Sequence, residues 1–72
     1  MGWPMSKPPV PRRVVHFLYD FHRVSQPLLV AAVHDETDAA AWSIRATIRR
    51  LANEETIVNT GTPDAPVWEV RE

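Results

Sequence analysis

The stretch that decides the fold is Thr37–Val58, TDAAAWSIRATIRRLANEETIV. Three apolar residues in it recur at the spacing of one helix face, namely Ile44, Ile48 and Leu51, with Ala41 and Ala52 flanking them. Thr37 or Asp38 can cap the start of such a helix, and the alanines that follow favour helical backbone. We therefore predict a helix from about Asp38 to Asn53, followed by a strand that begins in the β-branched run 56–58.

The opposite face of this predicted helix carries a large aromatic side chain and two guanidinium groups. Its residues are Trp42, Arg45, Ala46, Arg49 and Asn53. Two interpretations stay open from the sequence: Trp42 folds back onto a neighbouring element, or this face binds a partner.

A first helix is expected from Arg12 to Arg23, with Pro11 in its first turn, where a missing backbone N–H costs little. We expect Phe17, Leu18 and Phe21 to face the core together with Val14. The solvent-facing side of this helix would hold the polar residues Arg12, Arg13, His16, Asp20 and Arg23.

A second helix is expected from Pro27 to about His34, burying Leu29, Ala32 and Val33, because Pro27 breaks the preceding helical pattern. The six-residue apolar run 28–33 is also compatible with a buried strand, because periodicity alone does not separate the two. His34–Asp38 is interpreted as a solvated acidic turn between the helices; it lacks the glycine that lets cation-binding loops curl, so no metal site is expected.

The C-terminal part alternates as two strands, Thr56–Thr60 and Val67–Arg71, joined by a loop at Gly61–Pro66 that is rich in turn-forming residues. We expect Ile57, Trp68 and Val70 to face the core, and Asn59, Glu69 and Arg71 to face water.

These motifs together resemble the winged helix-turn-helix superfamily. The resemblance rests on Trp42-Ser43-Ile44, Ile48, Leu51 and the exit Glu54–Val58, and it covers roughly Val14 to Val70. It implies a mostly α, α+β fold with three helices and a small antiparallel sheet whose hairpin is the wing. It also favours the helix over the strand for 28–33, with a short edge strand at 24–26 before it. The domain would span residues 11–72, after a flexible, proline-rich arm at 1–10.

The resemblance also implies a function, sequence-specific binding of double-stranded DNA by a small transcriptional regulator. Carried onto this chain, the DNA-facing residues would be Ala41, Trp42, Ser43, Arg45, Ala46 and Arg49, with backbone contacts from Arg12 and Arg13. Two features depart from DNA-binding members: the predicted wing holds Asp64 and no cation, and Trp42 replaces a smaller polar residue. Both fit the alternative, a protein-interaction module that uses the face of Trp42, Arg45 and Arg49; a homodimer is left open.

The net charge and the residue composition exclude several classes of function. The chain of 72 residues has a net charge of −1, but residues 39–53 hold three arginines and no acid, so its basic surface is local. A chain with only two glycines cannot form a glycine-rich phosphate loop. His16 and His22 point in different directions on the first predicted helix, so they cannot share a metal ion. We therefore expect neither an enzyme nor a cofactor. No cysteine and no long apolar run favour a cytoplasmic protein that does not enter a membrane.

Overall fold

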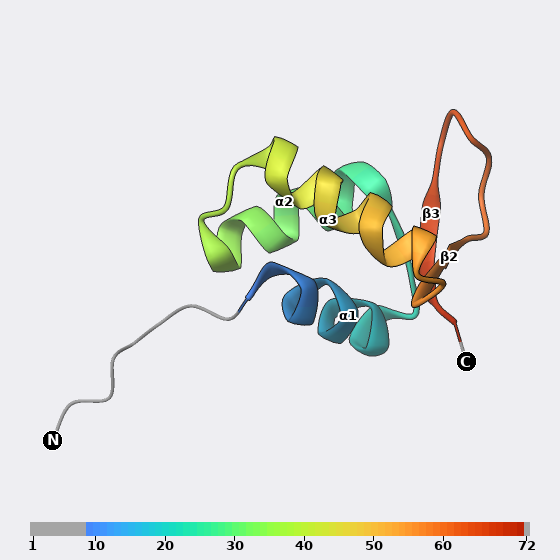
Figure 1. The fold of residues 1–72 in the computed structure, drawn as a ribbon, viewed down its shortest axis with the longest axis horizontal. Helices are drawn as coiled ribbons and strands as arrows, with labels where there is room; N and C mark the ends of the chain where they lie inside the picture. Colours follow the sequence, from blue (N-terminus) through green and yellow to red (C-terminus); the bar gives the residue numbers. More distant parts are fainter. Residues whose placement is uncertain (1–8, 72) are drawn as a thin grey trace, which may run out of the picture.

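The computed structural model describes residues 9–71, which form a small, mostly helical α+β domain (Figure 1). Its elements follow in the order α1 (Val10–Phe21), β1 (Arg23–Ser25), α2 (Gln26–Thr37), α3 (Ala41–Asn53), β2 (Ile57–Asn59) and β3 (Val67–Val70). Figure 1 shows the three helices on one side of the small sheet. The expected arm at 1–10 lies mostly outside the described residues, and Val10 already belongs to α1.

Helix α3 confirms the predicted apolar face. Ile44, Ile48 and Leu51 are all buried, and they pack in one core with residues from every other element. Burying such aliphatic side chains stabilises the fold by roughly 1.5–3 kcal/mol each. The core fixes one face of α3 and leaves the other outside.

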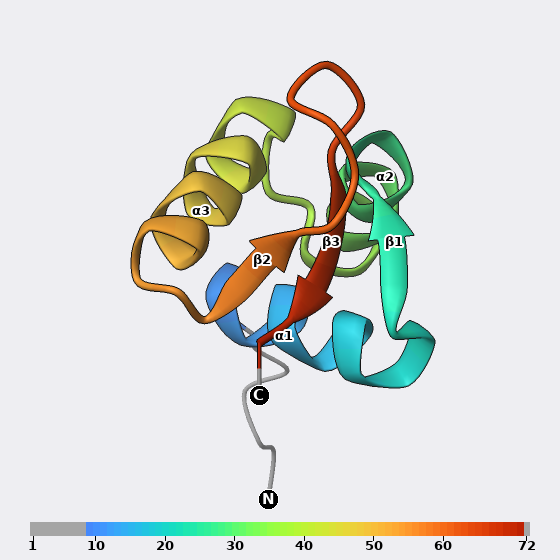
Figure 2. The ribbon, with the colours of Figure 1, turned by 90° about the vertical axis from the view of Figure 1, so that its right-hand side faces the viewer.

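The sheet is antiparallel, with strand order β1-β3-β2, so β3 is its centre (Figure 2). Val24 pairs with Trp68 on one side, and Ile57 pairs with Val70 on the other. Ile57 and Trp68 are buried as predicted, and Val70 is half-buried against the same core. Val24 is buried with them. On the outer face, Arg23 and Glu69 sit directly opposite each other and form a cross-strand ion pair at 3.8 Å.

Asn59 does not face away from the core as predicted. It lies opposite Trp68 in the register and two residues after Ile57, so its side chain is on the core face of the sheet. There it accepts hydrogen bonds from the backbone N–H groups of Gly61 at 2.8 Å and Val67 at 3.1 Å. The prediction was wrong because a polar side chain at a strand end can close a loop instead of meeting water.

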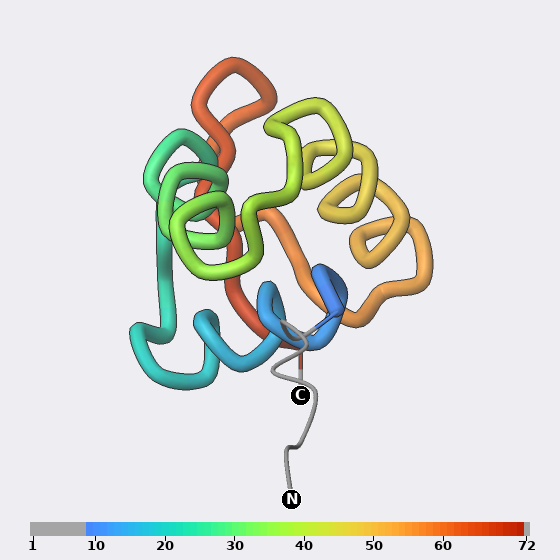
Figure 3. The backbone as a smooth tube through the Cα atoms, turned by 90° about the vertical axis from the view of Figure 1, so that its left-hand side faces the viewer, coloured from blue at the N-terminus to red at the C-terminus, as the bar shows by residue number. Residues whose placement is uncertain are grey.

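The segment 34–38 is not the turn that the sequence predicted. Helix α2 continues to Thr37, whose hydroxyl donates to the carbonyl of Val33 at 2.7 Å, and the turn is only residues 38–40 (Figure 3). Asp38 takes a left-handed conformation with φ of 58° and ends α2. Neither Thr37 nor Asp38 therefore caps α3, which begins at Ala41 after Ala40 with no side-chain cap.

Helix α2 itself confirms the helical interpretation of 28–33 and excludes the buried strand. Leu29 and Val33 are fully buried, whereas Ala32 is only half-buried. Helix α1 begins two residues before the predicted Arg12 and buries Val14 and Leu18. Phe21 was expected in the core but is 60% exposed, and Phe17 beside it is half-buried, because the core lies on the side of Val14 and Leu18.

Candidate functional site

The outward face of α3 is the most distinctive exposed surface of the domain. Trp42 is 72% exposed, so the interpretation in which it folds back onto a neighbouring element is wrong. Arg45, Ala46, Arg49 and Asn53 are exposed beside it, as the helix phase predicts. An apolar ring and two cations are thus presented together on a rigid helix.

The two arginines of this face are available to a partner. Within residues 9–71, neither Arg45 nor Arg49 forms an ion pair, whereas Arg13, Arg23 and Arg71 all do. Arg50 is exposed and unpaired in the same range, but it lies about 100° further round the helix from Arg49. Four described arginines are thus unpaired: Arg45 and Arg49 lie beside Trp42, Arg50 lies to one side of them, and Arg12 stands on α1.

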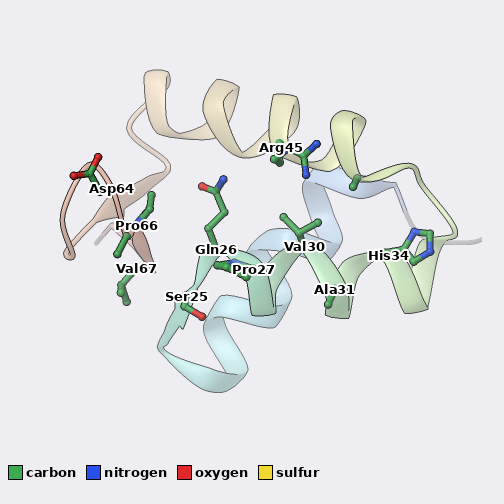
Figure 4. Close-up of a pocket in the computed structure, with 12 residues that line it drawn as sticks. Ser25, Gln26, Pro27, Val30, Ala31, His34, Arg45, Asp64, Pro66 and Val67 are labelled. Atoms are coloured by element: carbon green, nitrogen blue, oxygen red, sulfur yellow. The ribbon is translucent and has the colours of Figure 1, made fainter.

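Two hollows adjoin this face. The first, which we call the loop groove, measures about 590 Å³ between α3 and the β2–β3 loop, and its walls include Trp42, Arg49, Pro63 and Trp68. The second, the α2–α3 hollow, measures about 750 Å³ between α2, the start of α3 and the same loop (Figure 4). Three residues line both: Gln26, Arg45 and Pro66. These residues join the two hollows into one concave surface along α3.

Gln26 is a member of this surface that the sequence reasoning missed. Its side-chain oxygen accepts a hydrogen bond at 3.0 Å from the indole nitrogen of Trp68, which can only donate. The bond fixes the first residue of α2 against the central strand and leaves the amide nitrogen of Gln26 as a donor. No local signal marks it, because the two residues are 42 positions apart in the chain.

The β2–β3 loop that walls both hollows is tightly closed. Besides the two bonds to Asn59, the hydroxyl of Thr62 accepts from the backbone N–H of Ala65 at 3.0 Å. At Gly61, a Cβ atom would lie 2.5 Å from the carbonyl oxygen of Ala65, so only glycine fits there without movement of the backbone. The loop thus holds Pro63 and Pro66 in a defined position against α3.

The predicted DNA-facing residues separate into two groups. Trp42, Arg45, Ala46 and Arg49 all line the loop groove, and Ala41 lines the α2–α3 hollow. Ser43 is half-buried and lines neither hollow, and its carbonyl accepts the hydroxyl of Thr47 at 3.0 Å. Arg12 and Arg13 stand on α1, which contributes no residue to either hollow. Arg13 forms an ion pair with Glu36 of α2. Its side chain is half-buried, whereas the sequence predicted it on the solvent-facing side of the helix.

Among the described residues, no three histidine or acidic side chains converge to hold a metal ion. His34 instead makes a local contact: its Nδ1 lies 2.7 Å from the carbonyl oxygen of Ala39, which can only accept, so Nδ1 carries the proton.

The helices of residues 9–71 are also too short or too polar to cross a bilayer.

Comparison of the chain with protein-family models, with curated proteins and with solved structures gave no match. The features of the domain that bear on its function are the outward face of α3 and the two hollows beside it.

Proposed function

We propose that the chain is a winged helix-turn-helix domain that binds double-stranded DNA as a small transcriptional regulator, with α3 lying in the major groove. The observation that carries the proposal is the pair Arg45 and Arg49, exposed side by side on α3 and without ion pairs in the described part of the chain. Arginine has the forked donors that suit the edge of guanine or a phosphate.

The arrangement of the elements supports this proposal. The order α1-β1-α2-α3-β2-β3 and the strand order β1-β3-β2 suit a winged helix, with α2, the turn 38–40 and α3 as the helix-turn-helix. The buried residues of α3 attach the helix to the core, so its outward face can enter a DNA groove without disturbing the packing of the core. Ala46, which is small and follows Arg45 on α3, leaves room for a thymine methyl group.

A second candidate function is favoured by Trp42 and Asp64. An indole that is 72% exposed and flanked by arginines has the composition of an anchor in a protein interface. The loop beside it carries an exposed carboxylate and no cation, which opposes contact with phosphate. In this alternative, the loop groove takes a protein segment.

One titration separates the two functions. The 72-residue chain is titrated against a duplex selected from random sequence, at two salt concentrations. The titration compares wild type, Arg45→Ala and Arg49→Ala with the control Arg50→Ala. If an arginine reads a base, its removal costs about 1–3 kcal/mol and relaxes specificity at one position. If it contacts a phosphate, all duplexes weaken alike and the salt slope falls by about one unit.

The control variant Arg50→Ala separates the effect of losing one positive charge from the effect of losing a contact in the proposed interface. Arg50→Ala removes the same charge from the same helix but from a position outside both hollows. We expect Arg50→Ala to bind more tightly than either other variant. Absence of binding above background for every duplex at low salt overturns the DNA proposal. A protein complex that Trp42→Ala weakens by about 2 kcal/mol or more, with little salt dependence, would establish the second function instead.

A further inference from the structure

The α2–α3 hollow is the larger of the two concave surfaces, and it is not explained by DNA binding. At about 750 Å³ it lies within the size range of small-molecule sites, roughly 300–1,000 Å³. Its lining is mainly apolar and includes Val30 and Ala31 of α2 and Pro66 of the loop (Figure 4). A site of this kind takes an apolar ligand body and fixes it with a few polar groups.

Five polar residues line the hollow, and they are unevenly distributed along it: Ser25, Gln26, His34, Arg45 and Asp64. Figure 4 shows Gln26 reaching from α2 toward α3, where Arg45 lies, while Asp64 stands apart on the loop. Arg45 has no ion pair within residues 9–71, and Gln26 offers its amide nitrogen because its oxygen is bound to Trp68. Two donors, one of them charged, therefore lie at the α3 side, and a carboxylate stands at the loop side.

We propose that the α2–α3 hollow binds a small organic monocarboxylate with an apolar body. The carboxylate pairs with Arg45 and accepts from Gln26, while the body lies over Val30 and against Pro66. Asp64 opposes a second negative charge at the loop end, so the site selects monocarboxylates over dicarboxylates.

The same residue connects the hollow to the proposed function. Arg45 also lines the loop groove, so a ligand carboxylate that holds it withdraws a cation from the surface that faces DNA. A bound ligand then lowers the affinity for DNA. This consequence rests on the proposed DNA binding, whereas the site itself does not.

The test is a titration of the isotope-labelled 72-residue chain with phenylacetate, which is monitored through the backbone amide signals of Gln26 and of residues 28–34 and 41–45. Phenylacetamide, with the same shape and no charge, and phenethylamine, a cation, are the comparison probes. We expect saturable shifts with phenylacetate and binding at least about tenfold weaker with both comparison probes, equivalent to about 1.4 kcal/mol. Arg45→Ala should show the same loss, and Arg50→Ala should bind like wild type.

A second variant tests the location. Ala31 is exposed on α2, so Ala31→Trp fills the hollow from a position outside the core, and it should abolish the shifts. Equal binding of phenylacetamide or phenethylamine, no saturable shift with wild type, or unchanged binding by Ala31→Trp overturns the proposal. In a DNA titration, phenylacetate should weaken the wild-type complex and leave that of Ala31→Trp unchanged. If no duplex binds at all, the proposed function fails while the amide shifts still decide the site.

Discussion

The indole N–H of Trp68 donates a hydrogen bond to the side-chain oxygen of Gln26 across 3.0 Å. Trp68 belongs to the central strand β3, and Gln26 is the first residue of α2. The bond therefore joins the sheet to the helical part of the domain at the point where the two hollows meet. The backbone N–H of Gln26 also donates to the carbonyl oxygen of Pro66 at 3.0 Å, so both groups of Gln26 help to position the concave surface.

We expect Gln26→Ala to lower the free energy of unfolding by about 1 kcal/mol, because it leaves the part-buried indole N–H without its acceptor. Gln26→Glu keeps an acceptor oxygen and should stay close to wild type. Urea unfolding followed by tryptophan fluorescence measures both. Equal losses in the two variants would show that the hydrogen bond is not the cause.

Leu51→Ala should lower the free energy of unfolding by about 2–5 kcal/mol, since Leu51 is only 5% exposed at the end of the apolar face of α3. Leu28→Ala is the matched control, because Leu28 is 59% exposed on α2. The control should stay within about 0.5 kcal/mol of wild type. A loss below roughly 1 kcal/mol for Leu51→Ala contradicts its place in the core.

Gly61→Ala should destabilise the β2–β3 loop. The added Cβ would lie 2.5 Å from the carbonyl oxygen of Ala65 and 2.9 Å from the backbone nitrogen of Val67, and neither backbone atom can rotate away. Overpacking of this kind costs about 1–3 kcal/mol. Asp64→Ala, at an exposed position of the same loop, is the control and should change stability little. Thermal unfolding measures both variants. Equal melting temperatures for Gly61→Ala and wild type would mean that the loop backbone moves to accept the Cβ atom without loss of stability.

Arg13 and Glu36 should show a measurable coupling. Their ion pair joins α1 to α2, with side chains 22% and 43% exposed, so a double-mutant cycle to alanine should give about 0.2–1 kcal/mol. Arg12→Ala, on the exposed side of α1, should leave stability almost unchanged. A coupling indistinguishable from zero would show that water screens the pair completely. The coupling should also fall as salt is added.

Much of the helical structure was predictable because it depends on neighbours in the sequence. The spacing of Ile44, Ile48 and Leu51 predicted the buried face of α3, and the same phase placed Trp42 and Arg45 outside. Helix ends were less predictable. Thr37 is as suitable for a cap as for a last turn, and its hydroxyl bonds to the carbonyl of Val33 within α2.

The sequence by itself determined helices α1 and α3, the two strands of the hairpin and the basic outward face of α3, since each follows from local periodicity and turn chemistry. Periodicity left α2 open between a helix and a buried strand, and the structure decided for the helix. Only the tertiary structure decided that Phe21 is exposed, that Arg13 pairs with Glu36 and that Gln26 receives the indole of Trp68. Those outcomes depend on which elements lie beside one another in space. Side chains far apart in the chain meet only after the core has packed, and the two hollows along α3 are the space that this packing leaves.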